Sequence, residues 1–376
     1  MIRWVMIAAI ALVLGGSLLI VGGYIGLTLL TRGVAAGMFG ERTQPSNGAS
    51  AHSHLSLSLI GTTNIPSQVA GTPQRFGGIS GLVYEPDRSA WLAISDTWAR
   101  EHYFEIRISL QRETSSGPPR YSIEAEVAGA LALADHFRDP EGLAISPGGD
   151  QLAVVYEVPP IVAVVARDGT SIATLPVPPE VLAGCSSNRG LESVAWVARS
   201  GAQEIWAGTE ATLKQDRASM GPGGGGASRI SIFEAGSRAL KGQAIYPLEP
   251  EPLSMLGLPS LNWLTDLCAL PDGRVLALER SLSVPLGYAA CLFVVEGAAG
   301  EPATMPGGSA VPVLVKRRLA DLRADLGLTY LGNLEAMALG PPIEDDLGGR
   351  LLIIMADDNF GRDGQQGTQV IALRLK

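Results

Sequence analysis

One pattern recurs five times along the chain and limits the folds that it can adopt. Each copy has a polar start, an apolar strand, a turn with Gly, Pro or Asp, a second apolar strand and an acidic end. The five copies span 77–96, 139–157, 188–210, 264–280 and 332–359. Their alternating apolar residues and β-branched side chains predict a two-stranded antiparallel unit in every copy.

Two further strands are predicted after each of the first four copies. They lie at 103–110 and 121–129, 161–169 and 171–177, 228–236 and 243–249, and 290–297 and 311–319. The fifth copy is followed only by 368–376, and its missing fourth strand is available at 54–66. Four-stranded units in series, closed by pairing the two ends, predict an all-β propeller with five blades. Six blades stay open if one long interval hides another copy.

The copies align best at one small or apolar position in the first strand. These positions are Gly81, Gly142, Ser193, Leu267 and Ala336. Between the fourth and fifth copies, the segment "RRLADLRADLGL" at 317–328 predicts a short inserted helix.

The N-terminus forms a separate region. Residues 4–30 carry no charge, and this length exceeds the about 20 apolar residues that span a bilayer as a helix. We predict a signal anchor with its transmembrane helix at 1–32, a flexible linker at 33–53 and the propeller at 54–376, placed outside the cytoplasm on the periplasmic or extracellular face. The alternative is cleavage near the small residues at 33–37, which would give a secreted protein.

Charge and cysteine content exclude some classes of partner and site. The net charge is −9 and no basic cluster occurs, which argues against a nucleic-acid partner. The three cysteines are an odd number with no CxxC spacing, so neither a disulfide framework nor a zinc site is indicated.

Propeller geometry predicts where the acids of the five copies lie. The first strand of each blade lines the central channel and the second runs antiparallel to it, so the start of one and the end of the other share a face. We therefore expect a ring of carboxylates at one mouth of the channel. The acids expected nearest the axis are Glu141, Glu192, Asp266 and Glu335.

Carboxylates gathered in this way repel one another unless a proton, an arginine or a hard cation offsets the repulsion. Calcium prefers oxygen ligands, so we predict that the four axial acids bind calcium or a similar divalent cation. The alternative is structural, because acids at strand ends also cap turns or pair with arginines of the next blade.

Catalytic and substrate-binding roles are predicted for neighbouring charged residues. Glu157 or Asp358 would take up a proton during catalysis. The guanidinium groups of Arg138, Arg189 and Arg280 would bind a phosphate or another anion of the substrate.

Several segments resemble the phytase-like family, which is labelled by an esterase-like activity of phytase. They are "GGISGLVYEPDRSAWLAISD", "DPEGLAIS", "LER" and "NLEAMAL…DDNF", in that order along the chain. The resemblance covers about 53–376 and implies an extracytoplasmic propeller. It does not transfer catalytic residues to this sequence.

Two hypotheses of function follow. The first is a metal-dependent hydrolase acting on a small-molecule ester or phosphoester at the acidic mouth. The second is a non-catalytic binding propeller of the cell envelope with a structural calcium ion. Neither an RHGxRxP motif nor a GxSxG elbow occurs, so histidine acid phosphatase and serine hydrolase mechanisms are not indicated.

Overall fold

The computed structural model describes most of one compact unit, His54–Lys376. The described residues are 54–68, 75–96, 102–113, 119–132, 139–186, 189–199, 201–219, 226–250, 260–284, 286–298, 303–304, 310–361 and 367–376. The predicted anchor at 1–32 and linker at 33–53 lie outside them. Within the described residues, no helix has the length and apolar character needed to cross a membrane.

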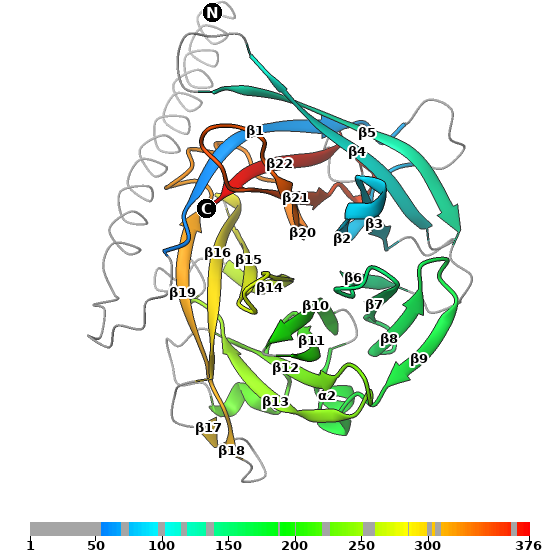
Figure 1. Cartoon of the computed structure of the whole chain (residues 1–376). Coiled ribbons are helices and arrows are strands. Elements are labelled where there is room, and N and C mark those ends of the chain that lie inside the picture. The colour runs from blue at the N-terminus through cyan, green and yellow to red at the C-terminus, as the bar shows by residue number, and fades with distance from the viewer. Residues whose placement is uncertain are drawn as a thin grey trace, which may run out of the picture. The chain divides into compact units, whose positions relative to one another are not determined.

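Five four-stranded antiparallel sheets surround a central axis (Figure 1). From the axis outward, the first blade holds β2 (Ile79–Glu85), β3 (Ala90–Ser95), β4 (His102–Arg112) and β5 (Tyr121–Ala132). In the same order, the second blade holds β6 (Pro140–Ile145), β7 (Gln151–Tyr156), β8 (Ile161–Ala166) and β9 (Ser171–Leu175). The third blade holds β10 (Leu191–Arg199), β11 (Ala202–Thr209), β12 (Ala227–Glu234) and β13 (Leu240–Pro247).

The fourth and fifth blades complete the circle. The fourth consists of β14 (Ser260–Ala269), β15 (Val275–Ser283), β16 (Gly287–Ala298) and β19 (Leu314–Asp321). The fifth consists of β20 (Asn333–Pro342), β21 (Arg350–Asp357), β22 (Thr368–Leu375) and β1 (Leu57–Ile65). Outside the blades lie a two-stranded ribbon and a short helix, namely β17 (Ala303–Thr304), β18 (Ala310–Val311) and α2 (Pro179–Gly184).

The two ends of the propeller close the fifth blade. β1 pairs antiparallel with β22, from Leu57 opposite Leu375 to Ile65 opposite Thr368. The chain therefore supplies the outermost strand of its last blade from its N-terminal side. The prediction of an all-β propeller with five four-stranded blades is confirmed.

The core lies between neighbouring blades, because the inner strands of each blade are covered on both faces by the blades beside it. All six residues of β3 and all eight of β22 are buried, which explains why these strands read as continuous apolar runs. Between the first and second blades, Val83 and Ile94 belong to the same buried cluster as Leu143 and Val154. Burial of apolar side chains thus holds each blade to the next.

The innermost strands converge around the channel. β2 contacts β6 and β20, β6 contacts β10, and β14 contacts β10 and β20, which closes a ring of five. The close approach requires small residues. A Cβ at Gly81 would lie 2.6 Å from the Leu143 nitrogen, and one at Gly142 would lie 2.8 Å from the Glu192 carbonyl oxygen.

Every innermost strand carries a β-bulge at the same position. In each of the five first-strand pairings one residue has no partner on the second strand, and these unpaired residues are Ser80, Glu141, Glu192, Thr265 and Glu335. A bulge redirects its side chain and frequently lies beside a functional site. The fold thus repeats one local distortion five times around the axis.

The register corrects two predictions from the sequence. The alignment of the fourth copy is wrong by one residue, because Asp266 rather than Leu267 follows the bulge there. The predicted helix at 317–328 is also wrong. Residues 314–321 form strand β19, which pairs with β16 and buries Leu314 and Ala320, and a turn follows. Pairing with a sheet edge outweighs the helix propensity of such a short segment.

Candidate metal centre at the channel mouth

Two sets of residues meet at one end of the channel. We call the five bulge residues the inner set. The outer set lies on the second strand of each blade. Each member is opposite the first-strand residue that comes two positions before the bulge, and the five members are Asp96, Glu157, Glu210, Arg280 and Asp357. Because the two strands are antiparallel, both sets lie at the same end of the blades. Acids occupy three of the five inner positions and four of the five outer positions.

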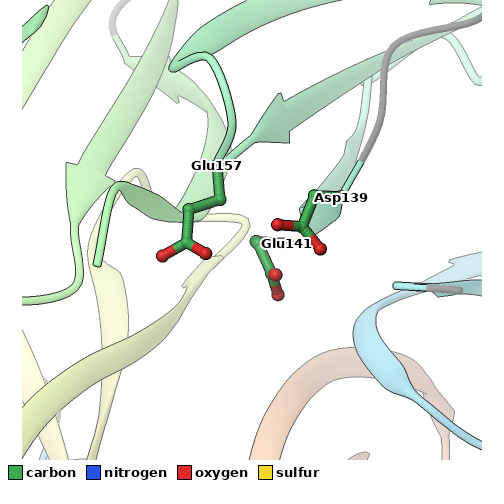
Figure 2. A group of neighbouring side chains, drawn as sticks. All are labelled: Asp139, Glu141 and Glu157. Atoms are coloured by element: carbon green, nitrogen blue, oxygen red, sulfur yellow. The ribbon is translucent and has the colours of Figure 1, made fainter. Parts of the chain in front are cut away.

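The first group of carboxylates comes from the second blade. One oxygen each of Asp139, Glu141 and Glu157 lies within 4.8 Å of the others, and in Figure 2 Glu141 lies between the other two. Asp139 is buried and adopts a left-handed backbone with φ of 64°. No described residue donates a hydrogen bond to the carboxylate of Asp139 or Glu141.

The second group joins the second blade to the third. One oxygen each of Glu157, Glu192 and Glu210 lies within 4.8 Å of the others, and all three side chains are buried. Glu157 belongs to both groups. Its Oε1 accepts the Gly190 N–H at 2.8 Å, and a Cβ at residue 190 would collide with Glu157. Glycine at this position therefore lets the backbone approach and orient the shared carboxylate.

Arg280 replaces the acid of the outer set in the fourth blade. Its Nη1 donates to Glu335 and, at 2.5 Å, to Asn333, while its Nη2 donates to Glu210 at 3.2 Å. The guanidinium also lies 5.0 Å from the Trp263 ring centroid. One buried cation thus links the acids of the third and fifth blades across the fourth.

Arg189 is the other described guanidinium near this cluster. It lies 5.4 Å from the same Trp263 ring. Burial raises the pKa of Glu157 and Glu210, and the charge of Arg189 opposes this shift in part. No described carboxylate or carbonyl accepts a hydrogen bond from it. Its donors are therefore available to a ligand, whereas those of Arg280 are engaged.

Burial and mutual repulsion raise the pKa values of the acids at the mouth. Burial, then Glu192 and Glu335, raise the pKa of Glu141 well above its usual range, and burial, then Glu210 and Glu335, do the same for Glu192. Burial raises the pKa of Glu210 and Glu335 to about 7, although Arg280 opposes the shift. Burial raises the pKa of Asp357 to about 8. Protons thus remain on part of the cluster near neutral pH.

These carboxylates suit a hard divalent cation. Ligand atoms at about 2.3–2.6 Å from one calcium ion lie at most about 5 Å apart, a limit that both groups meet. Asp139 and Glu192, each more than nine-tenths buried, have no hydrogen-bond donor among the described residues. A buried carboxylate without a donor is costly unless a proton or a cation satisfies it.

Two predicted residues lie apart from this cluster. Both oxygens of Asp266 accept backbone N–H groups, from Leu267 at 2.8 Å and Met337 at 2.6 Å, and Thr265 takes the bulge position instead. Asp358 is fully buried and accepts hydrogen bonds from Ser67 Oγ at 2.6 Å and from the Phe360 N–H at 3.1 Å. Arg138 lies outside the described residues.

One acid of the mouth, Asp139, is not among the residues that the sequence predicts for the site. Its carboxylate nevertheless faces Glu141 and Glu157. Asp139 is one of three non-glycine residues near the mouth that adopt a left-handed backbone. The other two are Asn359, with φ of 46°, and Phe360, with φ of 54°. Residues with strained backbone of this kind cluster at functional sites, but no sequence pattern predicts which residues adopt it.

The family model described as "Phytase-like: Esterase-like activity of phytase" matches residues 74–360. No curated protein matches the chain. Among solved structures, "Kuenenia stuttgartiensis Hydrazine Synthase" is 14% identical with a TM-score of 0.33, covering 77% of this chain and 80% of that one. "Catalytic domain of Coprinopsis cinerea GH62 alpha-L-arabinofuranosidase" is 10% identical with a TM-score of 0.44, covering 85% and 97%. Both TM-scores are too low to support an argument.

Proposed function

Because the chain belongs to the phytase-like family described by an esterase-like activity of phytase, we propose that it is a cation-dependent hydrolase of ester or phosphoester bonds. The reaction would take place at the mouth of the propeller channel. The observation that carries the proposal is the pair of buried carboxylate groups that share Glu157. Such a cluster is unfavourable by itself and becomes favourable when a cation is bound.

The proposed ligands differ in part from those expected from the sequence. Glu141, Glu157 and Glu192 would hold the cation, with Asp139 and Glu210 beside them. Calcium suits this set best because every ligand is a carboxylate oxygen. When bound, a divalent cation supplies a Lewis acid that polarises the substrate oxygen. Asp266 is left out because its oxygens are already hydrogen-bonded.

Glu335 is the best-placed group to take up and return a proton. Its pKa of about 7 is close to neutral pH, where a general base is most effective. It belongs to the inner set and interacts with Glu141 and Glu192. Asp358, expected from the sequence, suits this role less well because both of its oxygens accept hydrogen bonds. Both hydrogen bonds to Glu335 fall on Oε1, so its Oε2 has no donor among the described residues. Glu157 suits the cation better.

Arg189 would bind the negative group of the substrate. Its guanidinium lies 5.4 Å from the Trp263 ring centroid and has no acceptor among the described residues, while Arg280 is engaged with Glu210 and Glu335. An anion would reach this position only after a cation has offset the negative charge of the mouth.

Removal of the cation tests the proposal. We expect the purified protein to hydrolyse p-nitrophenyl esters or phosphodiesters, and a chelator to lower the rate at least about 100-fold because the Lewis acid is lost. Calcium added in excess should restore the rate. Hydrolysis that survives the chelator would contradict the cation's role. Calcium binding without turnover on any ester would instead favour the binding propeller.

The membrane anchor at 1–32 and the placement of the propeller outside the cytoplasm stay predictions from the sequence. They rest on the uncharged segment at 4–30, and membrane fractionation of the expressed chain would test them.

A further inference from the structure

The described acids of the mouth form two separate carboxylate groups that have one member in common. No group of described acids at the 4.8 Å spacing combines Asp139 or Glu141 with Glu192 or Glu210. The ligand oxygens of one calcium ion lie within about 5 Å of one another, so each group by itself meets the requirement of one ion. Only the carboxylate of Glu157 is within reach of both positions.

We propose that the mouth binds two divalent cations, with the carboxylate of Glu157 shared between them. The first ion is held by Asp139 and Glu141 together with Glu157, and the second by Glu192 and Glu210 together with Glu157. This inference rests on the proposed function in so far as the mouth must bind a cation at all. Beyond the proposed function, it specifies how many ions bind and which residues hold each of them.

Each group contains a carboxylate on a buried residue that has no hydrogen-bond donor in the described part of the chain. Asp139 is 7% exposed and Glu192 is 6% exposed, and no described residue donates a hydrogen bond to either side chain. Each one faces the other two acids of its own group. Because an unpaired buried carboxylate is costly, each group needs its own compensating charge.

Glu157 has the free capacity that sharing requires. A carboxylate has two oxygens with about four acceptor positions, and the Gly190 N–H uses only one of them, on Oε1. The same hydrogen bond fixes the side chain at the boundary between the second and third blades. Glu157 is thus held in place without being saturated.

The charge of the mouth also favours two ions. Eight carboxyl groups gather there with only two guanidinium groups among the described residues, namely Asp96, Asp139, Glu141, Glu157, Glu192, Glu210, Glu335 and Asp357 with Arg189 and Arg280. An ion bound by one group does not contact the unshared carboxyl groups of the other, so each group keeps ligands for an ion of its own.

Titration of the full chain with calcium counts the ions directly. Calorimetry should find two ions in the wild type and in Glu126→Gln, whose exposed carboxylate lies on the outer strand β5. Asp139→Asn and Glu192→Gln should each bind one ion. Glu157→Gln should weaken both by at least tenfold. Asparagine tolerates the left-handed backbone at residue 139, so that variant should fold.

Manganese gives a second readout that does not depend on hydrolysis. Two Mn²⁺ ions that share a carboxylate should give a spin-coupled electron paramagnetic resonance spectrum in the wild type and uncoupled spectra in both single-ion variants. One ion in the wild type, lost equally in Asp139→Asn and Glu192→Gln, would overturn this inference and leave the proposed function intact. An uncoupled spectrum with two ions bound would overturn the shared role of Glu157. Absence of any bound ion would overturn both.

Discussion

Glu157→Gln should lower the rate of ester hydrolysis by at least about 100-fold at saturating substrate, more than any other single carboxylate substitution at the mouth. Glu157 is the only described residue within ligand distance of both carboxylate groups. Its loss weakens every cation position, and a bound cation contributes several kcal/mol of transition-state stabilisation. Steady-state kinetics with excess calcium would measure the change.

The substitution is designed to leave the fold unchanged. Glutamine keeps an oxygen that can accept the Gly190 N–H, so the link between the second and third blades survives. Glu126→Gln is the matched control, since the Glu126 side chain is 70% exposed and pairs only loosely with Arg107 at 3.6 Å. A Glu157→Gln protein with the same melting temperature and a wild-type rate would contradict the role of this carboxylate.

Arg280→Met should destabilise the protein by about 3–5 kcal/mol near pH 8, because removing one partner of a buried pair leaves the other partners uncompensated. Glu210 and Glu335 would lose their cation in buried positions. The melting temperature should fall by on the order of 10 °C. Thermal unfolding monitored by circular dichroism, in chelator, would measure the loss.

The effect should grow with pH. Burial raises the pKa of Glu210 and Glu335 to about 7 even beside Arg280, so the folded protein binds more protons than the unfolded chain between about pH 4.5 and pH 7. Stability contributed by these groups is complete below that window and is lost as pH rises through it. Without Arg280 both pKa values rise further, so the loss extends to higher pH.

At pH 5 both carboxyl groups would be protonated and the variant should melt close to the wild type. The matched control is Arg107→Met, whose side chain is 65% exposed and whose effect should be below about 0.5 kcal/mol at either pH. An Arg280→Met protein with the same melting temperature as the wild type at pH 8 would show that the acids of the mouth do not need this cation.

Much of the architecture follows from local sequence. Each blade begins with a strand pair whose apolar runs and turn residues are readable, as in 139–157, and the ends of the chain supply the strands that close the fifth blade. The clustering of acids at one mouth also follows, because antiparallel pairing places the start of one strand beside the end of the next. Glu141, Glu192 and Glu335 take the bulge positions of their first strands.

The finer placement depends on the bulges, which the sequence does not reveal. Thr265 and Asp266 are adjacent and both polar, so only the observed register shows that Thr265 is unpaired and that Asp266 bonds to the backbone. The same one-residue shift affects Arg280, which the sequence predicts to bind an anion of the substrate. The acid of the "LER" segment is Glu279, and it bonds to Tyr246 and Lys316, while Arg280 takes the position at the mouth.

We propose that the carboxylate of Glu157 binds divalent cations at the channel mouth. Anomalous diffraction from crystals soaked in Mn²⁺ tests it most directly, because the scattering identifies the ion and its ligands together. We expect anomalous density in contact with Glu157, with Asp139 and Glu141 as ligands on one side and Glu192 and Glu210 on the other. A mouth without anomalous density at saturating Mn²⁺, with the acids still arranged as in Figure 2, would contradict it.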